Sequence, residues 1–302
     1  MILDRVRATG LVVAGAPLAV LLSGGRDSVC LLDVCVSLGA DVTALHVNYG
    51  LREDADLDER LCAATCARLE VPLVVERPER PDGGNLQAWA RDVRYAAALA
   101  LGGDVAAGHT ATDQAETILY RLAASPGRRA LLGMSPREGR VVRPLLAVTR
   151  DETGAHCTAR GLTFREDPSN ASDAFARNRV RAGLVEELRR VHPAAEANVV
   201  RTAALLREEA AVLDELVATA LGGGDGIALD HLAALPRALA RLIVRRLAED
   251  ATGALCARAA TRLDDVLALD DGALDLGDGA RAHVAGGILR IVPTPPLPAR
   301  TG

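Results

Sequence analysis

The chain has 302 residues and a formal net charge of −5, and 49% of its residues are hydrophobic while only 2% are aromatic. This length suits one large α/β domain with a smaller second one, whose cores must be packed mainly with Ala, Val, Leu and Ile. Every basic side chain is an arginine, because the sequence contains no lysine. A Schiff-base lysine, a lysine general base and the lysine of a Walker-A loop are therefore excluded.

Cysteine spacing and hydropathy exclude two further classes. The six cysteines form no Cys-x-x-Cys pair and no spacing typical of zinc, so we expect buried, reduced thiols and a cytoplasmic location. The apolar run from Leu11 to Leu22 is too short to cross a bilayer. It leads directly into a glycine-rich loop, which disfavours a signal peptide. We therefore expect a soluble protein with no membrane partner.

The first half of the chain alternates short apolar runs with longer helical patterns. Strands are predicted at Leu18–Leu22, Val42–Val47, Val71–Glu76 and Asp104–Ala107. Helices are predicted at Asp27–Leu38, Asp54–Leu69, Leu86–Leu101 and Thr112–Ala124. This alternation is typical of an α/β fold with a doubly wound parallel sheet and right-handed crossovers. Ligands of such sheets bind beyond the carboxyl ends of the strands, so functional residues should follow each strand directly.

The second half of the chain is richer in helical patterns. They cover Thr149–Arg160, Asp173–Arg190 and Ala194–Leu221. The glycine-rich segment 222–226 is the strongest break in the pattern. We therefore predict a first domain at residues 1–215, which includes a connecting helix, and a smaller, mostly helical domain at residues 216–302. Short strand-like pieces occur in the latter around Leu274 and at Ile288–Val292.

The best-defined motif is the loop between the first predicted strand and its helix. It reads Ser23-Gly24-Gly25-Arg26-Asp27-Ser28. Glycines let the backbone approach phosphate oxygens, the serine hydroxyls can donate, and the helix start offers free N–H groups. A carboxylate at Asp27 would repel phosphate unless Mg²⁺ lies between them or the residue merely starts the helix. An ordinary capped turn is the alternative. However, the strand, the glycines, the hydroxyls and the helix start follow one another in the order that a nucleotide-phosphate site requires.

A second polar cluster follows the fourth predicted strand. His109, Asp113 and Glu116 share one face of a helix that begins at the carboxyl end of that strand. Such a cluster can hold Mg²⁺, bind an amino group or relay a proton, whereas an acidic first turn in solvent is the ordinary alternative. His46 and Asn48 end the second strand, where a nucleotide's adenine would lie, although a histidine there is as often a core residue.

Arginines form the third group of candidates. Arg91 and Arg94 precede the fourth strand and can meet a carboxylate or phosphate, or extend along the helix surface. From residue 121 to residue 207 the chain has 16 Arg against 9 Asp and Glu, despite its negative total charge. A charge run is usually a solvated face. The segment Arg177-Asn178-Arg179-Val180-Arg181 is denser than that, and with Arg143 it predicts contacts to RNA phosphates or base edges.

Taken together, these motifs resemble a known family. Ser-Gly-Gly-x-Asp-Ser is the loop signature of the PP-loop, or N-type ATP pyrophosphatase, superfamily, and the ordered set over residues 18–181 is most similar to the tRNA(Ile)-lysidine synthases. The supporting motifs are His46-Val-Asn-Tyr-Gly-Leu-Arg52, Gly108-His-Thr-Ala-Thr-Asp-Gln-Ala-Glu-Thr117, Val142-Arg-Pro-Leu-Leu146, Asp167-Pro-Ser-Asn170 and Arg177–Arg181. The sequence departs from the family pattern at Tyr49 and Thr110, where histidine is usual, and at Thr112, where an acidic residue is usual.

The resemblance implies the ATP-dependent ligation of free L-lysine to the wobble cytidine of a tRNA(Ile) with a CAU anticodon. An adenylated base would form first, and lysidine, AMP and pyrophosphate would be the products. By this resemblance, Ser23–Ser28 would bind the phosphates and Asp27 would bind Mg²⁺. Arg91 or Arg94 would bind the carboxylate of lysine. Asp113 and Glu116 would receive lysine's amine or the metal. The implied catalytic residues are Asp27, His109, Asp113 and Glu116. The resemblance also implies that the small domain at residues 216–302 binds the tRNA substrate. A homodimer is among the assemblies that the resemblance allows.

Three other functions remain open on the sequence alone. A PP-loop tRNA sulfur transferase shares the loop but commonly uses a well-placed cysteine pair. An amidotransferase-type ligase would need a glutaminase domain, for which we find no segment. A non-catalytic ATP-binding regulator would not release AMP steadily in the presence of RNA.

Overall fold

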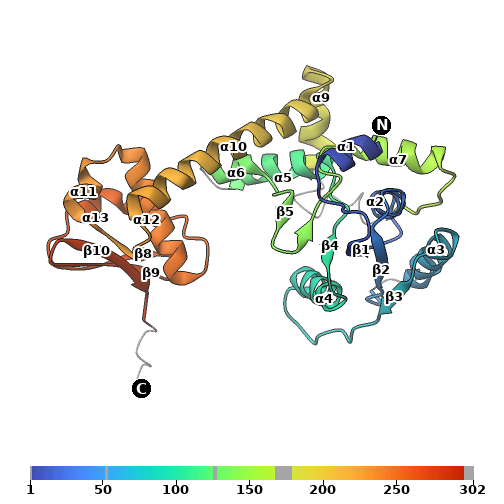
Figure 1. Ribbon diagram of the computed structural model, residues 1–302, viewed down its shortest axis with the longest axis horizontal. Coiled ribbons are helices and arrows are strands. Elements are labelled where there is room, and N and C mark those ends of the chain that lie inside the picture. The colour runs from blue at the N-terminus through green and yellow to red at the C-terminus, as the bar shows by residue number, and fades with distance from the viewer. Residues whose placement is uncertain (1, 52–53, 125–127, 167–178, 296–302) are drawn as a thin grey trace. The chain divides into compact units, whose positions relative to one another are not determined.

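The computed structural model describes residues 2–51, 54–124, 128–166 and 179–295, and the chain divides into two compact units (Figure 1). The units are Met1–Leu206 and Arg207–Gly302. The division falls within the long helix α10 (Ala195–Leu221), as does the boundary drawn from the sequence between residues 215 and 216. None of the described helices is both long and apolar enough to span a membrane.

A six-stranded sheet forms the centre of the first unit. Its strand order is β3-β2-β1-β4-β6-β5, and every neighbouring pair is parallel except β5 and β6. The strands are β1 (Pro17–Leu21), β2 (Asp41–Val47), β3 (Leu73–Glu76), β4 (Asp104–Ala106), β5 (Arg137–Glu138) and β6 (Val141–Val142). The predicted α/β fold with a parallel sheet is confirmed. Neither β5 nor β6 was predicted, because two residues are too few to show a strand period.

Helices cover both faces of this sheet. The alternation of side chains along β1 separates two cores, since Leu18 and Val20 point to one and Ala19 and Leu21 to the other. Buried residues of α1, α2, α3 and α7 complete the larger core, and Ala98 of α4 belongs to the smaller one. The helices of this part are α1 (Ile2–Ala8), α2 (Arg26–Ser37), α3 (Ala55–Arg68), α4 (Leu86–Ala100), α5 (Ala111–Ala124), α6 (Arg128–Leu132) and α7 (Arg150–Ala159).

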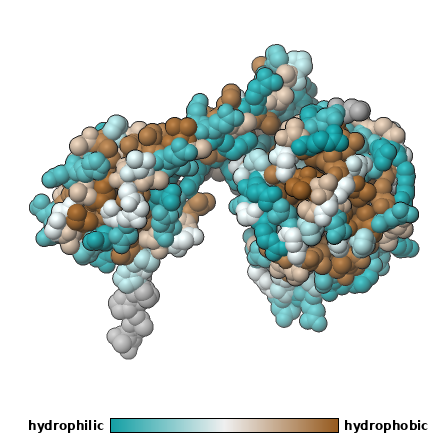
Figure 2. All heavy atoms as spheres, in the orientation of Figure 1, coloured by the Kyte–Doolittle hydropathy of each residue, from teal (hydrophilic) through white to brown (hydrophobic). Residues whose placement is uncertain are grey.

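The described chain resumes at Arg179 with helical structure. A π-helical turn, η2 (Val180–Val185), is followed by α9 (Glu186–Val191) and then by α10. The predicted helix Asp173–Arg190 therefore corresponds to η2 and α9 from residue 179 onward, and its first six residues lie outside the described part. Along α10, the side chains of Leu205, Val212 and Leu216 remain exposed, and Figure 2 shows hydrophobic residues among hydrophilic ones on this helix.

The second unit combines helices with a four-stranded antiparallel sheet. The strand order is β7-β10-β9-β8. The strands predicted around Leu274 and at Ile288–Val292 correspond to β8 and β10. Its core lies between one face of this sheet and the helices, chiefly α12. The elements are β7 (Gly226–Ala228), α11 (Leu229–Ala234), α12 (Arg237–Thr252), η3 (Ala259–Arg262), α13 (Leu263–Leu267), β8 (Gly272–Gly277), β9 (Ala280–Ala285) and β10 (Ile288–Pro293).

The turn from α4 into β4 depends on a glycine. Gly103 has φ +64°, and a Cβ there would lie 2.2 Å from the carbonyl oxygen of Pro17 at the start of β1. We expect Gly103→Ala to reduce the free energy of unfolding by about 2–5 kcal/mol, from backbone strain and overpacking together. Gly102 has φ +83° with nothing within 4 Å of a Cβ, so Gly102→Ala should cost only about 1–2 kcal/mol. Urea denaturation of both variants tests this, and equal losses would contradict the close approach.

Candidate active site

Hydrogen bonds within the glycine-rich loop after β1 fix its conformation. Ser28 Oγ donates to the carbonyl oxygen of Gly25 at 2.9 Å and accepts from the backbone N–H of Ser23 at 3.2 Å. Gly24 has φ +82°, and a Cβ there would lie 3.5 Å from Cys62 Sγ. Gly25 is the N-cap residue of α2 and offers no side chain to the first N–H groups of the helix. These groups therefore remain available to an anion.

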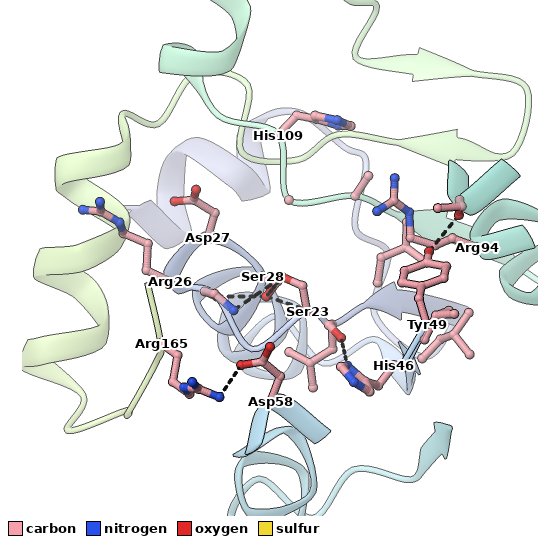
Figure 3. A pocket seen from close by; sticks show the side chains of 18 of the residues that line it. Ser23, Arg26, Asp27, Ser28, His46, Tyr49, Asp58, Arg94, His109 and Arg165 are labelled. Atoms are coloured by element: carbon pink, nitrogen blue, oxygen red, sulfur yellow. Dashed lines mark hydrogen bonds and ion pairs between the residues drawn. The ribbon is translucent and has the colours of Figure 1, made fainter. Parts of the chain in front are cut away.

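A pocket of about 780 Å³ opens over this loop. It lies at the carboxyl ends of β1, β2 and β4, the place expected for the ligand of a parallel α/β sheet. Figure 3 shows Asp27, Arg26 and Arg165 on one side of the pocket and Tyr49 and Arg94 on the other. The volume falls in the usual range for small-molecule and cofactor sites. The loop at one end and the aromatic side chains at the other suit a nucleotide.

Asp27 is the carboxylate within the loop, and Thr153 and Arg150 of α7 both lie against it. Its Oδ1 accepts a hydrogen bond from the hydroxyl of Thr153, which is fully buried, and its Oδ2 lies 3.8 Å from Arg150 Nε. Burial raises the pKa of Asp27, and the hydrogen bond from Thr153 opposes this shift. The nearby charge of Asp113 raises the same pKa further. An additional positive charge, such as a cation carried by a nucleotide, would relieve this unfavourable environment.

A protein-only metal site is absent from the part of the chain that the structure describes. No three His, Cys, Asp or Glu side chains among those residues gather closely enough to hold an ion. Mg²⁺ is commonly bound by one or two carboxylates together with substrate phosphates and water. A single carboxylate at Asp27, beside a phosphate loop, fits that arrangement.

The cluster predicted on α5 comes together with an arginine from outside it. Asp113 Oδ2 accepts hydrogen bonds of 2.8 Å from both the N–H and the hydroxyl of Thr110, so the residue caps its own helix. The fully buried Glu116 accepts from Nε and Nη2 of Arg181, whose Nη2 also lies 3.8 Å from Asp113 Oδ1. His109, Asp113 and Arg181 line the pocket. The sequence grouped Arg181 with RNA contacts and gave no sign of this pairing.

His46 and Asn48 both line the pocket and also support the loop region around it. The buried His46 ring places Nδ1 2.9 Å from the carbonyl oxygen of Leu22 and 3.4 Å from Cys62 Sγ. Asn48 Nδ2 donates to carboxylates of Asp56 and Glu59 at 3.1 Å and 3.0 Å. The side chains at the position predicted for adenine therefore have hydrogen-bond partners within the protein.

The two arginines of α4 have different surroundings. Arg94 lines the pocket, whereas Arg91 does not and instead lies with its guanidinium 4.9 Å from the ring centroid of Tyr95. Tyr49 closes the same end of the pocket, because its hydroxyl donates to the carbonyl oxygen of Ala90 at 2.7 Å. Its ring meets that of Trp89 edge to face at 5.6 Å. Arg94 is thus the better placed of the pair to meet a substrate group.

The remaining predicted arginines are dispersed. Arg143 is buried in the β5–β6 turn region, where its guanidinium donates to the carbonyl oxygen of Ser135 and to Glu138, and it does not line the pocket. Arg179 is exposed at the start of η2. Arg177 and Asn178 lie outside the described residues. The structure therefore does not join these residues into one site.

The segment from Arg150 to Glu166 supplies site residues that the sequence did not reveal. Arg150, Arg165 and Glu166 line the pocket, and the backbone N–H of Arg165 donates to the carbonyl oxygen of Gly24 at 3.0 Å. Arg165 also pairs with Asp54 and Asp58 at 2.6 Å and 2.9 Å, joining this segment to α3. The Thr149–Glu152 capping box marks the helix start in the sequence, but it does not tell which face meets α2.

Three of the cysteines, Cys35, Cys62 and Cys66, have the environment of an unreactive thiol. All six are buried and free. Burial raises the pKa of Cys35 and Cys62 to about 12 and that of Cys66 to about 11. A thiolate is the reactive form, so these three remain uncharged at neutral pH.

Comparison with known proteins identifies a family model and relatives that resemble this chain. The PP-loop domain model matches residues 8–188. The chain is 37% identical to a tRNA(Ile)-lysidine synthase of Geobacter sulfurreducens, over 95% of the chain and 66% of that relative, and 38% identical to one of Thermus thermophilus, over 76% of the chain and 47% of that relative. It thus spans about half to two thirds of these relatives' length. A U34-tRNA thiolase from Methanococcus maripaludis shares the fold at TM-score 0.57 and 17% identity, covering 68% of this chain and 78% of that one.

Removing the Thr153 hydroxyl tests its hold on Asp27. Thr153→Val keeps the buried shape but leaves an Asp27 oxygen without its donor, so we expect the activity proposed below, measured as AMP release with Mg²⁺, to fall about 10- to 100-fold. Thr153→Ser retains the hydroxyl and should stay within about threefold of the wild type. Steady-state assays over a Mg²⁺ series, with thermal melts to verify folding, measure the difference. Equal activity of the two variants would contradict a positioning role.

Proposed function

Because the chain belongs to the PP-loop family and its relatives named above are tRNA(Ile)-lysidine synthases, we propose that it is a ligase that uses ATP to join lysine to the wobble cytidine of tRNA(Ile). One observation carries this proposal. The loop Ser23–Ser28, Asp27 and the His109–Asp113 group open into a single pocket at the carboxyl ends of the strands. That pocket offers an anion site and an acid–base site within one ligand's reach.

The first step that we propose activates the base. The C2 oxygen of cytosine attacks the α-phosphate of ATP, a new O–P bond forms, and pyrophosphate leaves. This step is necessary because the C2 oxygen is a poor leaving group until it becomes a phosphate ester. The loop N–H groups and hydroxyls of Ser23 and Ser28 hold the phosphates in line. Asp27 would hold Mg²⁺, which when bound neutralises charge on the phosphates.

The second step that we propose forms the C–N bond. The ε-amine of lysine attacks C2, AMP leaves with the former C2 oxygen, and the amine must lose its proton to a nearby base. Asp113 and His109 line the pocket, and we assign this role to them. Glu116 is buried behind them against Arg181, so it supports this group by holding the arginine. Arg94, at the other end of the pocket, would face the lysine carboxylate.

Transfer of sulfur is less well supported. The fold likeness to a tRNA thiolase extends to many PP-loop chemistries, and fold alone does not carry function. The six buried thiols of this chain offer no accessible pair for sulfur relay.

Mass spectrometry of the tRNA tests the reaction directly. After incubation of CAU-anticodon tRNA(Ile) with ATP, Mg²⁺ and isotope-labelled lysine, the anticodon cytidine should carry the labelled lysine, and AMP should accumulate. Asp27→Asn should lower product formation at least about 100-fold. Because burial raises the pKa of Asp27, the ionised carboxylate destabilises the fold at neutral pH, so the variant's melting temperature should not drop. A thiolated or unmodified cytidine with the wild type would overturn the proposal.

The RNA partner is tested by salt dependence at Arg179. This residue is exposed outside the pocket, and a phosphate contact there would release counterions. We expect Arg179→Ala to flatten the slope of log affinity against log salt by about one unit, with ATP affinity unchanged. Arg7→Ala is the control, since Arg7 is also exposed and pairs with Asp4 on α1. Parallel lines for Arg179→Ala and the wild type would show that the residue does not contact tRNA.

A further inference from the structure

Five arginines line the pocket, and their partners differ. Three of them are engaged by groups that belong to the scaffold. Arg165 pairs with Asp54 and Asp58, Arg181 pairs with Glu116, and Arg94 lies 5.6 Å from the ring centroid of Tyr95. The other two, Arg26 and Arg150, share one carboxylate, that of Glu166.

The shared carboxylate bridges the two guanidinium groups. Glu166 Oε1 lies 2.9 Å from Arg26 Nε, and Oε2 lies 3.3 Å from Arg150 Nη2. The side chain of Glu166 is 50% exposed, whereas those of Arg26 and Arg150 are 23% and 17% exposed. The two cations are therefore fixed in the wall of the pocket, and the anion between them can move into solvent.

The surrounding backbone fixes where this bridge is made. Arg26 is part of the phosphate loop, and Arg150 is the first residue of α7. The neighbouring Arg165 donates its N–H to the carbonyl oxygen of Gly24, which keeps Glu166 beside the loop. Arg150 Nε is buried and has no hydrogen-bond partner among the described residues, and it lies 3.8 Å from Asp27 Oδ2. A donor thus remains for an incoming oxygen.

We propose that Arg26 and Arg150 form the subsite for the pyrophosphate portion of ATP, and that Glu166 occupies it as an internal anion when no nucleotide is bound. Carboxylate and phosphate oxygens satisfy guanidinium donors in the same planar geometry, so one can replace the other. The identification of pyrophosphate as the leaving group rests on the proposed function. The subsite itself requires only that the ligand is a polyphosphate.

This exchange has a consequence for turnover. ATP has to displace Glu166, which lowers its affinity, and Glu166 returns to the arginines as pyrophosphate leaves. The carboxylate of Glu166 is half-exposed, so it can be hydrated by water when it leaves the two guanidinium groups. The carboxylate therefore limits how tightly the charged product can be held without removing the positive charge needed for binding.

Binding measurements on the full-length protein test the exchange. Isothermal titration with pyrophosphate, and separately with ATP, each with Mg²⁺, gives the dissociation constants. Glu166→Gln removes the competing charge and should tighten both by about threefold to tenfold. Arg150→Ala should weaken both by about tenfold, because a charge-assisted hydrogen bond is lost. In the Arg150→Ala background, Glu166→Gln should have a smaller effect than in the wild type. Glu187→Gln is the matched control, since it breaks an exposed ion pair with Arg190 on α9.

The outcomes separate this inference from the proposed function. Tighter binding by Glu166→Gln alone, with Glu187→Gln unchanged and both proteins melting like the wild type, supports the internal anion even if no lysidine is formed. Unchanged or weaker binding by a folded Glu166→Gln protein overturns it, even if the wild type makes lysidine. Unchanged binding by folded Arg150→Ala removes Arg150 from the subsite and likewise overturns it.

Discussion

The hydrogen bond from Thr153 to Asp27 joins the two helices on which the site depends. It is one of several contacts that fix α7 along α2, the helix that begins at the phosphate loop. Further along, His156 of α7 and Arg160, the residue that follows this helix, both contact the buried carboxylate of Asp33 on α2, at 2.7 Å and 3.1 Å. A buried charge without such partners would be strongly destabilising. The same packing that satisfies Asp33 therefore sets the position of Asp27 beside the phosphates.

The absence of lysine shapes the electrostatics of the whole pocket. Each positive charge in its wall is a guanidinium, which stays protonated and can bind a carboxylate with two donors at once. Glu116 and Asp58 are buried or nearly so, and each is matched by an arginine from a distant segment, Arg181 and Arg165. These pairs link α5 and α3 to the chain that follows α7. Arg26 and Arg150 can face a ligand because their shared partner, Glu166, is half-exposed and can move.

Much of the fold and part of the site could be predicted from local patterns. Ser23–Ser28 and His109 directly follow strands with clear apolar runs, and a parallel sheet brings such positions to one edge. Arg150, Thr153 and Glu166 could not be found this way, because their role depends on which face of α7 meets α2. Arg143 and Arg181 both belong to the basic stretch of the sequence and could not be told apart there. In the structure, Arg181 pairs with the buried Glu116. Arg143 instead donates to the carbonyl oxygen of Ser135 beside β5 and β6.

The positions that depart from the family pattern are used as structural contacts. Thr110 and Asp113 cap α5 reciprocally, and Tyr49 closes the pocket against α4. Thr112 has the widest reach, since its hydroxyl donates to the buried Glu196 of α10 and accepts the backbone N–H of Arg150 at 3.2 Å. An acidic side chain there would face the carboxylate of Glu196, and the two charges would repel. A hydroxyl can instead donate to one neighbour and accept from the other. Threonine at this position therefore links α5, α7 and α10. It does so without adding a third negative charge to those of Asp27 and Asp113.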